Sequence, residues 1–247
     1  MQQPIPSKAD IKLIRSLGQK KSRDSTGLFV AEGEKIVAEA LCQSEIEVEA
    51  VYRTADTGED IMARMSQLAT PSPALAVMRM PGRESAREIL SRDYSGITLA
   101  LDSIRDPGNM GTILRIADWF GIDNILASED CVDIYNPKTI QASMGAFLRK
   151  RPAYIDLNTA IPTLSDCGIK IYATSLDGES IYGKRLEKSG VMIVMGSENN
   201  GISQALLDII PEKILIPPFI TGRDCSRSES LNVGTATAIF CYELRRN

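Results

Sequence analysis

Three polar segments hold the side chains that could do chemistry, and each directly follows an apolar, strand-like run. The first begins where the run ITLALD ends at Asp102; a Pro-Gly turn follows, and then Asn109, which is placed to cap a helix. Apolar residues recur along this helix at helical spacing, and Arg115 lies away from them. Asn109 can be explained as a helix cap and Arg115 as a solvated side chain, and the alternative is that both residues face a bound ligand.

The second segment, VMIVMGSENNGIS, runs from an apolar strand into a polar loop with a glycine at each end, Gly196 and Gly201. It is not a phosphate-binding Walker loop, because Ile202 stands where that motif needs lysine, and it lacks the GxGxxG fingerprint of dinucleotide-binding proteins. Glycines at both ends would let a ligand approach the backbone amides. An ordinary glycine-rich turn explains the pattern equally well.

The third segment starts where the strand KILIP closes at Ile216-Pro217-Pro218 and continues through a polar loop with Arg223 and Arg227. Ser230 and Asn232 then precede the last predicted helix. Hydrogen-bond donors and positive charge converge before this helix, which would suit an anionic substrate. A tightly packed terminal helix is the alternative, because small residues recur along it.

Composition excludes several kinds of active site. The chain of 247 residues has no histidine, which rules out Ser-His-Asp and Cys-His triads and histidine-ligated metals. Its five cysteines are widely spaced and never form a CxxC pair, so we expect no metal site and no disulfide framework. The sequence has no apolar run of membrane-spanning length and no secretory signal pattern, so we expect a cytoplasmic protein without membrane contact.

The formal net charge of −4 gives no general attraction to nucleic acid, so any RNA-binding surface must be local. One basic cluster follows a helix predicted over residues 7–18 and consists of Lys20, Lys21 and Arg23. These side chains could grip RNA phosphates, and a solvated helix face is an equal alternative.

Strands and helices alternate along the whole chain, so the fold class is α/β. A small α/β domain is predicted over residues 1–82 and a linker over 83–95. The larger domain, 96–247, has regular strand-helix alternation, which predicts a mostly parallel sheet covered on both faces. Ligands of such sheets bind beyond the carboxyl ends of the strands, where all three polar segments begin.

Together and in this order, the three segments resemble the motifs of the SpoU/TrmH (SPOUT) family of RNA 2′-O-ribose methyltransferases. Matching residues of the family pattern are Asn109, Gly111, Arg115, Gly196, Glu198, Gly201, Ile216, Pro217, Ser230, Leu231, Asn232 and Val233. Asn199 and Gly234 depart from the pattern. The resemblance covers about Ile97 to the C-terminus, and the early segment GLFVAEGEKIVAEAL resembles the L30e-like substrate-binding domain of many such enzymes.

The resemblance implies a deep C-terminal trefoil knot, a homodimer and a site shared between protomers. It also implies S-adenosylmethionine as cofactor and a ribose 2′-hydroxyl of structured RNA as acceptor, in ribosomal RNA rather than transfer RNA because of the additional N-terminal domain. Arg115 would activate the hydroxyl or stabilise the alkoxide, while Asn109, Glu198, Ser230 and Asn232 order the site. A non-catalytic RNA-binding or ribosome-assembly protein that keeps the fold is the alternative.

The cofactor pocket is predicted from strand ends together with the family's motifs. Its expected lining is Thr174, Ser175, Leu176, Gly196, Ser197, Glu198, Gly201, Ile216, Pro217, Pro218, Ser230, Leu231 and Asn232. A small-molecule dehydrogenase is a poorer alternative, since both its glycine fingerprint and a histidine base are absent.

Overall fold

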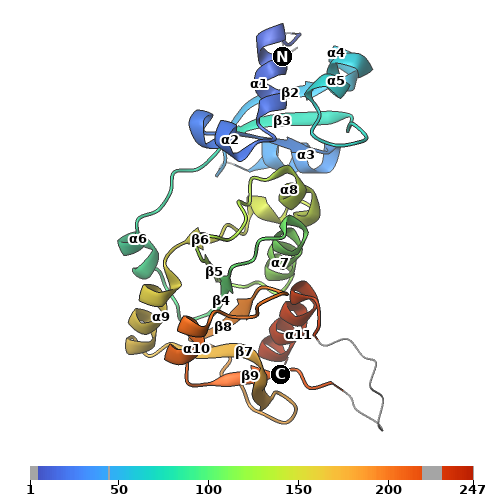
Figure 1. Ribbon diagram of the computed structural model, residues 1–247. Helices are drawn as coiled ribbons and strands as arrows, with labels where there is room; N and C mark the ends of the chain where they lie inside the picture. Colours follow the sequence, from blue (N-terminus) through green and yellow to red (C-terminus); the bar gives the residue numbers. More distant parts are fainter. Residues whose placement is uncertain (1–4, 44, 219–229, 247) are drawn as a thin grey trace.

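The computed structural model describes residues 5–43, 45–218 and 230–246, which form two α/β units stacked end to end (Figure 1). The N-terminal unit, residues 5–80, has a three-stranded antiparallel sheet in the order β1-β3-β2. Its strands are β1 (Leu28–Glu32), β2 (Val48–Arg53) and β3 (Ala74–Arg79). Its helices are α1 (Lys8–Ser16), α2 (Lys20–Thr26), α3 (Glu34–Cys42), α4 (Thr54–Thr57) and α5 (Glu59–Met65).

The C-terminal unit, residues 96–246, has a six-stranded parallel sheet in the order β6-β5-β4-β8-β7-β9. The strands are β4 (Ile97–Asp102), β5 (Asn124–Ala127), β6 (Ala153–Tyr154), β7 (Lys170–Ser180), β8 (Val191–Gly196) and β9 (Lys213–Leu215). The helices are α7 (Pro107–Trp119), α8 (Pro137–Ser143), α9 (Leu157–Asp166), α10 (Gln204–Ile209) and α11 (Val233–Arg245), with a 3-10 turn η1 (Ala146–Leu148). Between the two units, the connecting segment contains only the short helix α6 (Ala86–Leu90).

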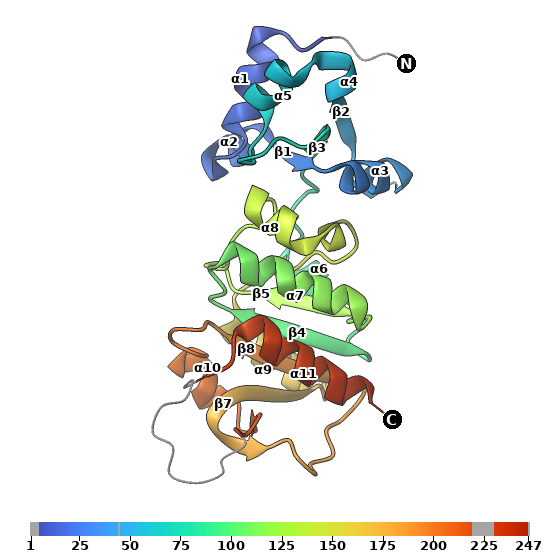
Figure 2. The ribbon, with the colours of Figure 1, turned by 90° about the vertical axis from the view of Figure 1, so that its right-hand side faces the viewer.

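Side-chain alternation along β4 shows how the sheet is covered on both faces. Leu99 packs into the cluster that includes α7 and α11, whereas its neighbour Ala100 packs into the cluster that includes α9 and α10. Figure 2 shows α7 and α11 lying side by side along one face of the sheet. Because helices cover both faces of the sheet, side chains on both sides of the central strands are buried, and these strands therefore have continuous apolar sequences.

The two units share an apolar contact. The Phe29 ring of β1 lies 4.5 Å from Tyr135 and 6.0 Å from Phe147, measured between ring centroids. Phe29 and Phe147 belong to one buried cluster that crosses the boundary, and the partly buried Tyr135 packs against it. Within the described ranges, no helix is long and apolar enough to cross a membrane.

Candidate active site

The loop after β4 positions the first motif. Asp106 is the N-cap of α7 and accepts the backbone N–H of Asn109 at 2.8 Å, with Pro107 in the first turn. The sequence-based assignment of Asn109 as the cap is therefore wrong. Because proline has no N–H to satisfy and suits the first helical position, the helix begins earlier than predicted, and the Asn109 side chain is left for other contacts.

The loop after β8 folds back on itself. Ser197 and Gly201 exchange backbone hydrogen bonds of 3.0 and 2.8 Å. A Cβ on Gly196 would lie only 2.1 Å from the carbonyl carbon of Gly201, and Gly201 itself has a φ of +64°. Both glycines are thus required by the loop's own close packing and left-handed turn, which agrees with the glycine-rich turn that the sequence analysis gave as an alternative.

The three motifs meet at Asn232. Its Nδ2 donates to Asn109 Oδ1 at 2.9 Å and to Glu198 Oε1. Its Oδ1 accepts the backbone N–H groups of Gly234 and Thr235 at 3.0 and 3.3 Å, which caps α11. Asn232 therefore fixes the start of α11 while joining residues from the other two motifs. We call Asn109, Glu198 and Asn232 the polar triad.

A hollow of about 230 Å³ lies beside the polar triad, at the carboxyl ends of β4 and β8. Its lining residues are Asp102, Ser103, Ile104, Arg105, Asp106, Asn109, Ser197, Glu198, Asn199, Asn200, Gly201, Ser203 and Val233. Asp102 is buried and accepts the Ser203 backbone N–H at 2.7 Å, which ties the first motif to the start of α10. The first two motifs thus form a single concave surface.

Other predicted cofactor residues lie on the neighbouring strands. Thr174 of β7 donates its hydroxyl to the Val194 carbonyl at 2.9 Å, and Ser175 donates to Asp177. Leu176 is 71% exposed. Ile216, Pro217 and Pro218 follow β9, the neighbour of β7, and are half-buried to exposed. Since the strands are parallel, these residues share the edge that holds the hollow, although they do not line it.

Ser230 and Leu231 are exposed just before Asn232. The polar loop that contains Arg223 and Arg227 lies outside the described residues.

Arg115 lies on α7, six residues beyond Asn109. At 3.6 residues per turn, this spacing turns its side chain about 120° away from Asn109 and moves it about 9 Å along the helix. Its side chain is exposed, and within the described part of the chain no hydrogen bond or ion pair joins it to the polar triad. Trp119, one turn further on the same face, is 85% exposed. The structure brings Asn109 into the triad but not Arg115.

The predicted RNA-binding residues lie on α2 and divide into two kinds. Lys20 and Lys21 are exposed, and Lys20 forms an ion pair with Asp24 of the same helix. The prediction for Arg23 needs correction, because its side chain is only 1% exposed and pairs with Asp133 of the C-terminal unit. A buried guanidinium that already donates four hydrogen bonds within the protein is not available to an RNA phosphate.

Sequence reasoning missed Asp130, which holds the loop of the first motif. It accepts hydrogen bonds from Ser103 and Arg105, both at 2.7 Å, and from Ser128. Burial opposes ionisation of this carboxyl group, but hydrogen bonds from Ser128, Arg105 and Ser103 outweigh it and lower its pKa to about 2. Nothing in the local sequence signals this role.

Across residues 5–43, 45–218 and 230–246, no group of three or more acidic or cysteine side chains could hold a metal ion.

Comparison with known proteins identifies the family of the chain. The SpoU rRNA methylase family matches residues 96–242, and the MRM3-like substrate binding domain matches residues 8–77. The chain belongs to the SpoU rRNA methylase family. This result confirms the family predicted from the three motifs, and the parallel sheet confirms the α/β class.

Three similar proteins match over nearly the whole chain. The 23S rRNA (guanosine(2553)-2′-O)-methyltransferase RlmP of Bacillus subtilis is 29% identical, over 95% of each protein. A TrmH-family protein from Porphyromonas gingivalis superposes with a TM-score of 0.85 at 35% identity, over 98% of this chain and 99% of that one. An AdoMet-bound rRNA methyltransferase from Sinorhizobium meliloti superposes with a TM-score of 0.82 at 27% identity, over 98% and 97% of the two chains.

Proposed function

We propose that this protein transfers a methyl group from S-adenosylmethionine to a ribose 2′-hydroxyl of ribosomal RNA. The observation that carries the proposal is the meeting of all three SpoU motifs at Asn232, beside a hollow at the carboxyl edge of the sheet. The Bacillus subtilis relative is named as a 23S rRNA 2′-O-methyltransferase, which favours ribosomal RNA over transfer RNA. A solved relative binds AdoMet, which supports this cofactor.

The residues around the hollow fit a cofactor that carries both charge and hydrogen-bonding groups. Glu198 offers a carboxylate, and the loop from Ser197 to Gly201 brings backbone groups to the same wall. When bound, the cofactor supplies the electrophilic methyl group. The chain's own contribution is to orient the reactants, because placing two groups in the right geometry supplies much of the acceleration in a displacement. Asn232 holds Asn109 and Glu198 in place for this task.

Arg115 acts by holding charge in this proposal. A guanidinium stays protonated in proteins, so a role as general base is disfavoured. Binding a phosphate of the RNA and stabilising the developing alkoxide are roles that its planar set of donors performs readily.

We further propose a homodimer in which Arg115 completes the site of the partner. Arg115 faces away from the polar triad of its own chain, and the exposed Trp119 on the same helix face provides apolar surface for a second copy. We also propose that the C-terminal segment forms a trefoil knot and that the protein is cytoplasmic. The proposed domains are a substrate-binding domain over residues 1–82, a linker over 83–95 and a methyltransferase domain over 96–247. RNA contact through Lys20 and Lys21 completes the proposal.

Single-turnover methylation of ribosomal RNA by wild type, Arg115→Ala and Arg115→Lys tests the chemistry. The alanine variant should be slower by roughly 10²–10³-fold, the usual cost of losing one donor to a developing oxyanion. Its melting temperature and cofactor affinity should stay close to wild type, because an exposed side chain is removed. Lysine should restore activity only in part, since it lacks the planar fork. Near-normal turnover by the alanine variant would show that Arg115 is only a solvated helix residue.

Complementation tests the shared site. Arg115→Ala and Glu198→Gln chains with different tags are co-expressed, and the mixed dimer is purified through both tags. If Arg115 acts across the dimer, each mixed dimer has one intact site out of two, so activity returns to roughly half of the wild-type value. If both residues act within one chain, the mixed dimer stays inactive. A protein that binds ribosomal RNA and never methylates it would support the non-catalytic alternative.

A further inference from the structure

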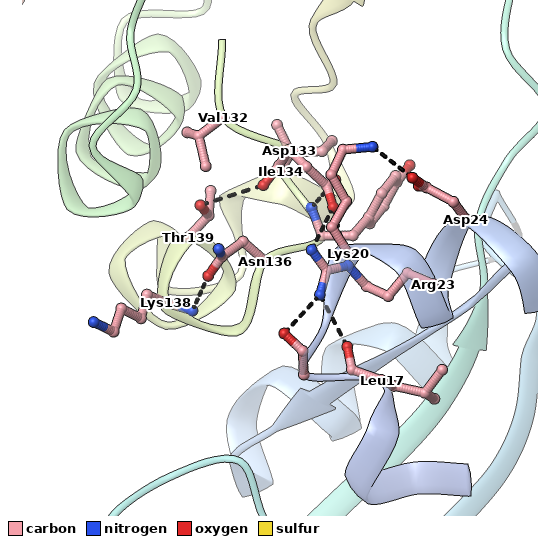
Figure 3. Close-up of polar contacts among 12 residues, drawn as sticks. Leu17, Lys20, Arg23, Asp24, Val132, Asp133, Ile134, Asn136, Lys138 and Thr139 are labelled. Carbon is pink, nitrogen blue, oxygen red and sulfur yellow. Dashed lines mark hydrogen bonds and ion pairs between the residues drawn. The ribbon is translucent and has the colours of Figure 1, made fainter. Parts of the chain in front are cut away.

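Arg23 is a buried charge at the boundary between the two units, away from the hollow. Its Nε and Nη2 donate to Asp133 Oδ2 of the C-terminal unit at 3.0 and 2.6 Å (Figure 3). Its Nη1 donates to the carbonyl groups of Leu17 and Gly18 at 2.9 and 3.1 Å. One side of the guanidinium is therefore bonded to the N-terminal unit, and the other side is bonded to the C-terminal unit of the same chain.

Among the ion pairs that the structure describes at this boundary, the Arg23–Asp133 pair is the most buried, with side-chain exposures of 2% and 15%. A hydrogen bond from Gln141 Nε2 to the Glu32 carbonyl at 2.9 Å also joins the units, but it involves no charged side chain. The Arg149–Glu39 and Arg151–Glu45 ion pairs also join the two units, but their side chains are 30–63% exposed, and such pairs contribute little. The apolar contact around Phe29 stabilises association but is not directional. A buried ion pair loses much of its favourable energy if either partner moves, so it restricts how one unit can rotate on the other.

The segment that contains Asp133 is bonded to the loop of the first motif. The backbone N–H of Val132 donates to the Ile104 carbonyl at 2.9 Å, and the Ile104 N–H donates to Cys131 Sγ at 3.2 Å. Ile104 lines the hollow, five residues before Asn109. Arg23 is therefore connected to Ile104 at the wall of the hollow through its bonds to Asp133, the peptide bond from Asp133 to Val132, and the hydrogen bond from Val132 to Ile104.

On its other side, Arg23 belongs to the same short helix as the exposed Lys20 and Lys21. The helix thus presents two cations to solvent and buries its third basic residue against the C-terminal unit. The helix that carries the two exposed lysines is therefore anchored to the C-terminal unit by its third basic residue.

We propose that the Arg23–Asp133 pair is a positioning contact that sets where RNA bound by the N-terminal unit presents its ribose to the polar triad. The inference rests on the proposed function and adds to it two residues that touch neither cofactor nor reacting atoms. Loosening the pair lets the RNA-binding unit shift while the hollow keeps its shape, so the methyl-transfer step is affected and cofactor binding is not.

Asp133→Asn is the selective test. The substitution keeps the size of the side chain and an oxygen for the Tyr135 backbone N–H, which Asp133 Oδ1 accepts at 2.8 Å, but removes the charge that faces Arg23. We expect the single-turnover rate at saturating RNA to fall about tenfold or more, since a displacement of about 1 Å costs up to about 10²-fold. Cofactor affinity should stay within about twofold of wild type, because the hollow is unchanged. Methylation should also spread from one nucleotide to neighbouring ones.

Glu212→Gln controls for the chemistry of the substitution, because it makes the same acid-to-amide change in the more exposed Lys170–Glu212 pair inside the C-terminal unit. Its rate and methylation position should equal those of wild type. Arg23→Gln should reproduce the Asp133→Asn defect, and the double variant should be no slower than the slower single variant, because both changes remove one contact. Independent, multiplying defects would overturn the proposal, as would a wild-type rate and position in Asp133→Asn.

Hydrogen exchange separates this proposal from the proposed function and from simple unfolding. In Asp133→Asn, amides of α2 and of residues 131–136 should exchange faster, whereas amides of β4 and β8 should keep their wild-type protection. Faster exchange throughout both units would mean general destabilisation and would refute a positioning role. Wild-type protein without methyltransferase activity would refute the proposed function, while the exchange pattern would still decide whether the pair restrains the two units.

Discussion

Gly111 offers a stability prediction whose size follows from the structure. It lies on α7 where that helix packs against α8, and a Cβ there would be 2.5 Å from Ala142 Cβ, 2.6 Å from the Thr139 carbonyl oxygen and 2.8 Å from the Ser143 nitrogen. Two of these three atoms belong to the backbone and cannot rotate away. Gly111→Ala therefore forces α7 and α8 apart, at an overpacking cost of about 1–3 kcal/mol.

Helix propensity acts in the opposite direction, since alanine is favoured over glycine by about 1 kcal/mol inside a helix. We expect Gly111→Ala to lose about 1 kcal/mol of unfolding free energy and about 3 °C in melting temperature, measured by urea and thermal denaturation. Methyl transfer should also slow, because α7 carries Asn109.

The control is Gly234→Ala in α11, where the nearest atom to an added Cβ is Thr112 Cγ2 at 2.8 Å, on an exposed side chain that can rotate. Its unfolding free energy should stay the same or rise by up to about 1 kcal/mol. A Gly111→Ala protein as stable as wild type would refute the reasoning, because it would show that α7 and α8 can accommodate a Cβ at this position without separating.

Three further predictions concern the site and its surroundings. Asn232→Asp keeps the cap of α11 but places a second carboxylate next to Glu198, so methyl transfer should fall about 10²-fold with little loss of stability. Asn232→Ala should lose the same activity and also about 1 kcal/mol of unfolding free energy, because it removes the cap. An active aspartate variant would contradict the role of the polar triad. The folded-state pKa of Asp130, about 2, lies below its usual value, so its stabilising contribution is present above pH 4 and is lost as the pH falls toward 2. Asp130→Asn should therefore lower the unfolding free energy by at most about 1 kcal/mol at pH 6, measured by urea denaturation. The difference from wild type should be smaller at pH 3. A difference that does not change with pH would count against the Arg105–Asp130 ion pair. Replacing Lys20 and Lys21 with glutamine should reduce the salt dependence of RNA affinity by about one unit of slope per phosphate contact, with cofactor affinity unchanged; an unaltered slope would exclude RNA contact there.

Local chemistry determined much of the fold. Ser7 and Asp10 form the capping box that starts α1 at the predicted place, with Asp10 N–H donating to Ser7 Oγ at 3.2 Å. Apolar runs such as ITLALD and VMIVMG became the central strands β4 and β8, because strands buried on both faces need continuous apolar sequence. The three polar segments that follow such runs resemble the motifs of the SpoU family, and the family comparison confirms that resemblance.

Local signals also misled where several neighbouring residues suited the same position. Asp106, Pro107 and Asn109 all suit the first turn of a helix, and the choice of Asp106 as cap became evident only from the backbone geometry. The sequence predicts no separate helix directly after residue 18, whereas Lys20–Thr26 form α2, which ends at Gly27 with a left-handed φ of +69°.

The tertiary structure alone decided which distant residues meet. Asn232 contacts Asn109 across 123 positions of sequence, and Arg23 contacts Asp133 across 110. Arg23 and its neighbour Lys21 are similar basic residues in sequence, yet one is buried and the other is exposed. Periodicity describes which face of an element is apolar, but strand order and helix placement result from the summed packing of the whole chain, and these determine which polar side chains are brought together and which cation becomes an ion pair.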